Sequence, residues 1–383
     1  MWNTPGVRAP LFALLLALSA CGARDGLQGP DRATNCDSCP LAVTSHLALG
    51  SEHTCVLARE SVFCWGTNRR GELGDGTTTD HVTPMRVPQL DAVVGLAASR
   101  AFSIPSGGSR GSRTCAWLVD GSVRCWGANV GLTDTAQGTP STVDGFVRAL
   151  QVSTSYWHTC ELQASGAVLC LGDTRVPTPG PALVRLSSAT SVTTGANFTC
   201  AARTDGSGWC WGDGSTGNLG GGFDISYQDS PQPVIGLSSV IQISSRHLHT
   251  CAVLRDGSVS CWGENFLGQL GDGTVVPRWT PVKVQGLVDA VSVSTGSNHT
   301  CAVRRSGRVM CWGDPSSVGA LPSTPRKPVD VANLENALEV AAGDGGTCAR
   351  LRDESVWCWG SLSGGLGDGT TTESALPVRV ALP

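Results

Sequence analysis

The chain has 383 residues, of which 49 are glycine and 21 are proline, and only 15% of the residues are charged. This composition indicates many short strands joined by tight turns rather than long surface helices. The net charge is −4 and no run of like charges occurs. Nucleic acid is therefore not an expected partner, because its binding requires a clustered positive surface.

A short apolar segment, Ala9 to Ala20, follows the single charge of Arg8. It is shorter than the roughly 20 residues of a membrane-spanning helix, and it fits the hydrophobic region of a signal peptide. The segment ends in Leu18-Ser19-Ala20-Cys21-Gly22, which resembles a bacterial lipoprotein signal. The resemblance implies a signal peptide over residues 1–20, a lipid on Cys21, and delivery to the outer membrane or cell surface. Ordinary secretion, with Cys21 incidental, is the alternative.

Residues 21–40 are polar and rich in turn-forming residues, as is typical of a lipidated cysteine followed by a flexible tether. This stretch contains Cys36-Asp37-Ser38-Cys39. A Cys-x-x-Cys motif can be redox-active in a βαβ context, which the sequence lacks here. A local structural disulfide between Cys36 and Cys39 is the favoured interpretation.

Fourteen further cysteines form seven pairs, and the two members of each pair are nine or ten residues apart. The pairs are Cys55/Cys64, Cys115/Cys125, Cys160/Cys170, Cys200/Cys210, Cys251/Cys261, Cys301/Cys311 and Cys348/Cys358. Their average period is about 49 residues, so residues 41–383 hold seven repeats without remainder. A period of this size is typical of propeller blades and similar arrays.

The spacing within the fifth pair predicts a hairpin. Two short β-prone runs flank Arg255-Asp256-Gly257, and a three-residue loop there places Cys251 directly opposite Cys261. The first pair is one residue closer and fits a two-residue turn at Arg59-Glu60. Opposed cysteines in an antiparallel pair are close enough to form a disulfide.

Three states of these cysteines are conceivable. Disulfides suit an exported chain. Zinc would need four converging ligands, which no repeat supplies, so no metal site is expected. Free buried thiols are not expected to stay reduced in an oxidising compartment. Disulfides are the favoured interpretation.

Two side chains recur beside the cysteines. Tryptophan follows the second cysteine in six repeats (Trp65, Trp126, Trp211, Trp262, Trp312 and Trp359), and Leu171 replaces it in the third. Histidine precedes the Thr-Cys of four repeats (His53, His158, His249 and His299). A tryptophan stripe could stack on carbohydrate, but a residue copied into every repeat is better explained by packing between blades.

Repeats one, five and seven add a glycine signature, as in Gly268-Gln269-Leu270-Gly271-Asp272-Gly273-Thr274, followed by Pro281 to Val284. Calcium or phosphate binding is not favoured, because the ligand density is too low and no helix follows. The order of cysteine pair, Trp-Gly, glycine signature and Pro-x-x-Val resembles the regulator of chromosome condensation repeat family.

The resemblance covers residues 41–383 and implies an all-β fold: a seven-bladed β-propeller of four-stranded antiparallel blades with one cysteine pair each. Repeats two, three and six lack the glycine signature, so short or irregular outer strands are expected there. In this family, strands from the two chain ends share a blade. By analogy, Pro377 to Val380 is expected to pair with the N-terminal strand around Leu41 to Leu49.

The expected function is a protein- or glycan-binding scaffold at the bacterial cell envelope, held to the membrane only by its lipid and needing no cofactor. The family's namesake promotes nucleotide exchange on a nuclear GTPase and binds chromatin, neither of which an exported, acidic chain is expected to meet. The alternative is a secreted hydrolase or lyase with a site in the central funnel. No catalytic residue is identifiable, because four of the seven histidines occupy the repeated position.

Two stretches that do not repeat are the candidate binding loops. The first is an insertion over Ser99 to Ser112, which includes Arg110. The second runs from Gly220 to Tyr227 and includes Phe223, Asp224 and Tyr227.

Overall fold

The computed structural model describes residues 45–103, 109–110, 112–128, 136–172, 182–222, 226–319 and 324–383. Residues 42–383 form one compact unit. Among the described residues, no helix is long and apolar enough to span a membrane. Cys21, with its predicted lipid, and Cys36 and Cys39, with their predicted disulfide, lie outside the described residues.

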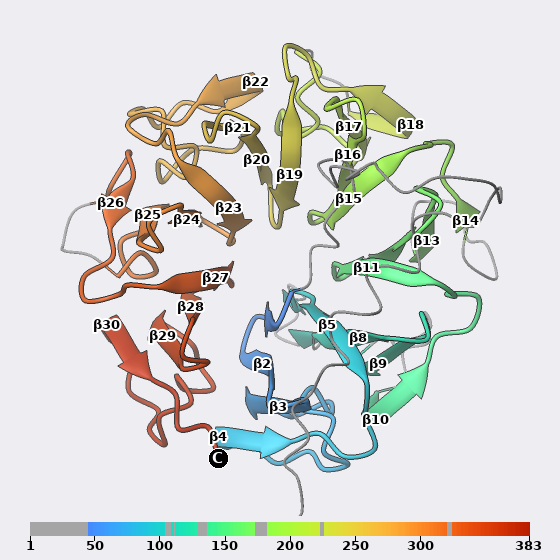
Figure 1. Cartoon of the computed structure of the whole chain (residues 1–383), viewed down its shortest axis with the longest axis vertical. Coiled ribbons are helices and arrows are strands. Elements are labelled where there is room, and N and C mark those ends of the chain that lie inside the picture. The colour runs from blue at the N-terminus through green and yellow to red at the C-terminus, as the bar shows by residue number, and fades with distance from the viewer. Residues whose placement is uncertain are drawn as a thin grey trace, which may run out of the picture. The chain divides into compact units, whose positions relative to one another are not determined.

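The described chain folds into seven four-stranded antiparallel sheets and one two-stranded hairpin. Figure 1 shows the sheets arranged as blades around a central axis, with the first strand of each blade innermost and the last outermost. The predicted seven-bladed β-propeller is confirmed.

The blades are built from consecutive strands, innermost first. Blade 1 comprises β1 (Leu47–Leu49), β2 (His53–Ala58), β3 (Ser61–Gly66) and β4 (His81–Arg86). Blade 2 comprises β5 (Val93–Ala98), β8 (Arg113–Leu118), β9 (Val123–Gly127) and β10 (Gln137–Thr142), with the hairpin β6 (Phe102–Ser103) and β7 (Ser109–Arg110) inserted. Blade 3 comprises β11 (Ala149–Thr154), β12 (His158–Gln163), β13 (Val168–Gly172) and β14 (Ala182–Leu183).

The remaining blades follow the same order. Blade 4 comprises β15 (Ala189–Thr194), β16 (Phe198–Arg203), β17 (Gly208–Asp213) and β18 (Tyr227–Pro233). Blade 5 comprises β19 (Val240–Ser245), β20 (His249–Leu254), β21 (Val259–Gly263) and β22 (Arg278–Lys283). Blade 6 comprises β23 (Ala290–Thr295), β24 (His299–Arg304), β25 (Val309–Gly313) and β26 (Val329–Asp330). Blade 7 comprises β27 (Ala337–Ala342), β28 (Gly346–Leu351), β29 (Val356–Gly360) and β30 (Ser374–Arg379).

Each blade carries one disulfide between its two middle strands. The seven bridges are those predicted from the spacing: Cys55–Cys64, Cys115–Cys125, Cys160–Cys170, Cys200–Cys210, Cys251–Cys261, Cys301–Cys311 and Cys348–Cys358. The paired Cα atoms are 4.1 Å apart in every case. Such a separation belongs to the close, non-hydrogen-bonded class of antiparallel pairs.

The hairpin turns also have the predicted lengths. In blade 5, Cys251 lies opposite Cys261 around a loop in which Gly257 takes a φ of +83°. That left-handed conformation costs glycine little. In blade 1, Ala58 pairs with Ser61 around Arg59 and Glu60, whose φ values of +50° and +63° are those of a two-residue turn.

The repeated tryptophans pack between neighbouring blades, as predicted. Trp312 of blade 6 is fully buried and donates a hydrogen bond of 2.8 Å from Nε1 to the carbonyl oxygen of Gln269 in blade 5. Gly271 of the same loop faces this ring so closely that a Cβ there would lie 2.8 Å from Nε1. The glycine signature of one blade therefore provides a flat surface for the tryptophan of the next.

The repeated histidines have an equivalent role at the same contacts between neighbouring blades, which we call seams. Each reaches the threonine that precedes the first cysteine of the next blade. The Nε2–Oγ1 distances are 2.7 Å for His53–Thr114 and His158–Thr199, 2.9 Å for His249–Thr300 and 2.8 Å for His299–Thr347. These side chains belong to the scaffold.

The expected closure of the ring by a shared blade is wrong. Pro377 to Val380 overlaps β30, which pairs with β29 of its own blade, while β1 pairs with β2. Because every blade is one continuous four-stranded stretch, neither chain end has to complete the other's sheet.

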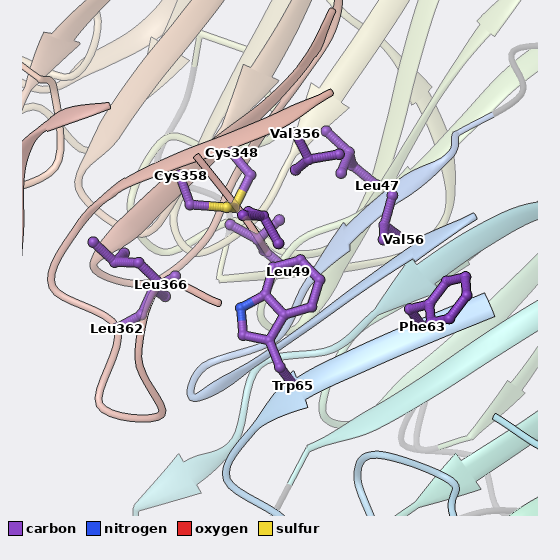
Figure 2. Close-up of a cluster of buried hydrophobic side chains, with 11 residues drawn as sticks. Leu47, Leu49, Val56, Phe63, Trp65, Cys348, Val356, Cys358, Leu362 and Leu366 are labelled. Carbon is purple, nitrogen blue, oxygen red and sulfur yellow. A yellow bond between two sulfur atoms is a disulfide. The ribbon is translucent and has the colours of Figure 1, made fainter. Parts of the chain in front are cut away.

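Hydrogen bonds and packing between the first and last blades close the ring instead, and one of them is a backbone hydrogen bond from Gly369 of blade 7 to the carbonyl oxygen of Val82 in β4. The Glu339 carboxylate of blade 7 accepts hydrogen bonds from the backbone N–H groups of His46 and Leu47 and from the Ser45 hydroxyl. Beside them, Leu47 and Trp65 of blade 1 share a buried cluster with Leu366 of blade 7 (Figure 2).

The expectation for the outer strands is confirmed for two blades and wrong for one. β14 and β26 each have two residues, as expected where the glycine signature is missing. β10 has six residues and a register shift between Gln137 and Ser141, much like β4 of the complete blade 1. β10 is held by its backbone pairing to β9, and this pairing does not depend on the glycine loop.

Candidate functional site

The propeller has two chemically different faces. Connections from the first to the second strand and from the third to the fourth lie on one face, which we call the loop face. The tight turns between the second and third strands, and the links to the next blade, lie on the opposite turn face. This division follows from the alternating direction of antiparallel strands.

A central channel of about 710 Å³ runs between the innermost strands of all seven blades. The described loops from first to second strand surround its loop-face end. They contribute Arg100, Tyr156, Trp157, Arg246 and His247, and Asp344 lies beside them. We call these six residues the channel mouth.

One carboxylate organises much of the channel mouth. Asp344 of blade 7 forms ion pairs with Arg100 of blade 2 (3.3 Å) and Arg246 of blade 5 (3.1 Å). It also accepts hydrogen bonds from Ser51 of blade 1 (2.6 Å) and Ser297 of blade 6 (2.7 Å). Five blades thus meet at one side chain.

Arg246 crosses between blades that are not neighbours. While its Nε contacts Asp344, its Nη1 donates a hydrogen bond of 2.8 Å to the carbonyl oxygen of Leu49 in blade 1. Its Nη2 is buried and has no hydrogen-bond partner among the described residues, and the same is true of Nδ1 of His247.

The electrostatics of the mouth follow from burial and from these ion pairs. Burial opposes ionisation of Asp344, but Arg246 and Arg100 outweigh it and hold the pKa of this carboxyl below its ordinary value. Burial lowers the pKa of His247 to about 4, and Arg100 adds to this effect. His247 is therefore neutral near pH 7.

An aromatic pair from blade 3 completes the mouth. The rings of Tyr156 and Trp157 meet edge to face with centroids 4.6 Å apart. The Tyr156 carbonyl accepts a hydrogen bond from the buried guanidinium of Arg113, which stands where other blades have histidine. Burial lowers the pKa of Arg113 to about 10.

Two serine–histidine contacts have the residue types of a catalytic pair, but their burial argues against catalysis. Ser112 lies 3.0 Å from Nδ1 of His53, and Ser155 lies 3.0 Å from Nδ1 of His158. All four residues are buried, and the other ring nitrogen of each histidine is held by a threonine of the next blade. Burial lowers the pKa of His53 to about 3, which makes it a poor base. Among the described residues, no cluster has the side chains to hold a metal ion.

The sequence-predicted loop residues are not brought to one described site. Arg110 lies in β7, in the inner loop of blade 2, and its side chain is outside the described residues. Phe223 and Asp224 are also outside them. Tyr227 begins the outer strand β18 of blade 4 and pairs with Asp213.

Sequence reasoning missed most of the channel mouth, although a signal was present. Arg246 and Asp344 each lie a few residues before a Thr-Cys pair, and Tyr156 and Trp157 precede His158. Arg100 has the same place in blade 2, where the insertion separates it from Thr114-Cys115. Aligning these short segments across the repeats shows that they do not repeat, whereas the residues that follow them do.

The family comparison finds the regulator of chromosome condensation (RCC1) repeat. One model of it matches residues 60–104 and 256–303, and a second matches residues 240–269 and 290–319. The ultraviolet-B receptor UVR8 of Arabidopsis thaliana is 29% identical over 61% of this chain and 56% of that protein. The human E3 ubiquitin-protein ligase HERC2 is 30% identical over 68% of this chain. The chain spans about half of the first of these relatives and 5% of the second.

A solved structure with the same fold is yeast RCC1 (Prp20), determined with Kap60 bound. It superposes with a TM-score of 0.74 at 20% sequence identity, covering 94% of this chain and 91% of that one. At this identity the likeness concerns the fold alone.

Proposed function

We propose that this chain, which belongs to the regulator of chromosome condensation repeat family, is a protein-binding scaffold that recognises its partner at the channel mouth. The supporting observation is that non-repeating side chains from several blades converge there. Arginine, tryptophan and tyrosine are also the residues in which binding hot spots are enriched. Elsewhere, the recurring tryptophan, histidine and glycine residues are used in packing between blades.

The fold agrees with a protein partner. Propellers hold loops on a rigid frame, and loops on rigid frames are common recognition sites. Yeast Prp20, which shares the fold, was solved with the protein Kap60 bound. A glycan partner would stack on Trp157, the partly exposed member of the aromatic pair, and the capture experiment distinguishes this outcome from a protein partner.

The insertion of blade 2 extends the proposed binding surface. Its hairpin, β6 and β7, begins two residues after Arg100 and ends before Arg113, so it arises beside the mouth. We include Arg110 in the surface on this ground. Deletion of residues 106–111 should weaken partner capture, and unchanged capture would remove the insertion from the proposal.

Envelope anchoring is the second part of the proposal, and it rests on the sequence around Cys21. Metabolic labelling with a fatty acid analogue should label the full chain, and Cys21→Ala should abolish the label and release the protein from the membrane fraction. A labelled Cys21→Ala variant, or an unlabelled native chain, would contradict lipidation at this residue. Binding at the channel mouth does not depend on that result.

The binding experiment compares the two faces. Arg100→Ala and Trp157→Ala should each reduce capture of envelope proteins by at least about tenfold, since hot-spot truncation costs about 2 kcal/mol or more. Arg255→Ala, an exposed arginine in a hairpin turn of the turn face, is the matched control. Equal capture by all three variants would overturn the proposed surface, whereas loss of glycan but not protein ligands would identify a carbohydrate partner.

A further inference from the structure

We propose that the central channel is a binding pocket for a carboxylate carried on an apolar chain, which enters from the turn face. This goes beyond the proposed recognition of a protein at the channel mouth. The inference starts from the channel volume of about 710 Å³, which is in the range of pockets that hold small organic ligands.

The entry direction follows from the bridged loop-face end. Arg246 extends from blade 5 to the Leu49 carbonyl of blade 1 and to Asp344 of blade 7. At the turn-face end, the innermost strands present exposed aliphatic side chains instead. Leu150, Ile241, Val291 and Leu338 share the second position of their strands and are 37%, 43%, 44% and 43% exposed, and Leu338 is the one of these four that lines the channel. Each belongs to a different blade.

The wall of the channel has two chemical halves. Blades 1, 2 and 7 contribute Ala48, Ala97 and Ala341 at one strand position, whereas blades 3, 5 and 6 contribute Ser153, Ser244 and Ser294 there. The wall also contains Ser292, whose buried hydroxyl has no hydrogen-bond partner among the described residues. An apolar chain with a polar end can contact both halves.

The charges favour an anionic end. Three arginines, Arg100, Arg246 and Arg350, line the channel, against the single lining carboxylate of Glu339 and the neighbouring Asp344. Among these five side chains, the arginines therefore outnumber the carboxylates by one. The buried Nη2 of Arg246, without a hydrogen-bond partner among the described residues, is a donor for a carboxylate oxygen, and hydrogen bonds between ionised partners are the strong ones.

A carboxylate on an apolar chain can come from a fatty acid or from the C-terminus of an apolar peptide. Octanoate and the tripeptide acetyl-Leu-Ala-Leu with a free carboxylate are suitable probes for the two sources. Octanamide and the amidated tripeptide are their neutral controls. Binding is measured by calorimetric titration of the full-length purified chain, together with the shift of its unfolding temperature.

At least one carboxylate probe should bind at least about tenfold more tightly than its amide, because the charge-assisted bond is lost in the amide. Binding of octanoate alone would identify a small-molecule ligand, and binding of the peptide alone would identify a chain terminus. Equal binding of acid and amide, or no binding of either acid, would overturn the proposal.

Two pairs of variants locate the binding. Ser292→Leu fills the channel and should abolish binding, whereas Ser306→Leu makes the same change in an exposed hairpin turn and should leave it intact. Leu338→Asp adds a negative charge at the entrance and should weaken carboxylate binding several-fold relative to Leu338→Asn. The second pair tests the site even if Ser292→Leu fails to fold, because Leu338 is partly exposed. Unchanged binding in Leu338→Asp would place the ligand outside the channel.

Discussion

The turn face and the loop face are built from the same repeat but differ in how strictly they keep it. On the turn face, the hairpin turns of blades 2 to 6 each accept a hydrogen bond from the start of the next blade, as where Ala290 donates its N–H to the carbonyl oxygen of Gly257 and Ala337 donates to that of Gly307. On the loop face, the connection from the first to the second strand carries Arg246 in blade 5 and Asp344 in blade 7. Positions that recur hold the ring together, whereas positions that differ create a surface specific to this chain.

The strongest test contrasts two tryptophans. Trp312→Ala removes a fully buried ring from a seam and should lower the free energy of unfolding by about 3–5 kcal/mol. Trp157→Ala removes a half-buried ring from the channel mouth and should cost about 1 kcal/mol or less. Chemical denaturation of both variants measures the difference. A similar loss of unfolding free energy in the two variants would contradict the assignment of Trp312 to the scaffold and Trp157 to the binding surface.

Removing one bridge tests how much the blades depend on their hairpins. Replacing Cys251 and Cys261 together by alanine should destabilise the protein by about 2–3 kcal/mol, as expected for a short closed loop. Ligand capture at the channel mouth should be retained, because neither sulfur reaches it. The readouts are the denaturation midpoint and the captured fraction, and lost capture in a folded variant would show that the faces are coupled.

Glu161 departs from the repeat without belonging to the mouth. Five other blades have alanine at this position (Ala116, Ala201, Ala252, Ala302 and Ala349), whereas Glu161 is buried with Oε2 lacking a hydrogen-bond partner among the described residues. Glu161→Ala should therefore stabilise the protein by about 1–3 kcal/mol at neutral pH.

The pH dependence of this effect has a defined sign. Burial raises the pKa of Glu161, so the folded chain holds this proton more tightly than the unfolded chain does. Native stability should fall as the pH rises from the ordinary carboxyl range through the raised pKa, and Glu161→Ala should lack that decline. Unfolding curves at several pH values measure it. If the stability of the native protein changed with pH in parallel with that of the variant, ionisation of Glu161 would not destabilise the fold.

The smallest expected effect is on the turn face. Arg304 forms an ion pair of 2.8 Å with Asp289, and both side chains are partly exposed. Arg304→Gln should cost about 0.2–1 kcal/mol, and the cost should vanish at high salt because exposed pairs are screened. Thermal unfolding at low and high salt is the measurement. A salt-independent loss would point to a packing role for the Arg304 side chain.

The sequence predicted the blade number, the disulfides and the hairpin register because these depend on residues close together in the chain. The separation of Cys251 from Cys261 and the glycine at 257 determine one local geometry. The closure of the ring was not predictable in the same way, since it depends on Glu339 meeting His46 and Leu47 nearly 300 residues away.

The channel mouth was missed for a related reason. No local spacing connects Arg100, Arg246 and Asp344, which become neighbours only when blades 2, 5 and 7 face the same axis. The sequence does mark these positions as exceptions to the repeat. It does not reveal which exceptions converge, and Glu161 is an exception that stays within a seam.

The closure of the ring without a shared sheet has an evolutionary and a practical consequence. Since none of the sheets in the described part of the chain is divided between blades 1 and 7, a cut at any blade junction leaves each of these sheets whole. The Arg59 guanidinium of blade 1 donates a hydrogen bond to the carbonyl oxygen of Pro383, which places the C-terminal end beside the first blade, so a linker between the ends of the propeller could replace the native break. Circular permutation should therefore be tolerated at the other six junctions, and gene duplication could add or remove one blade at a time without disturbing the pairing within its neighbours.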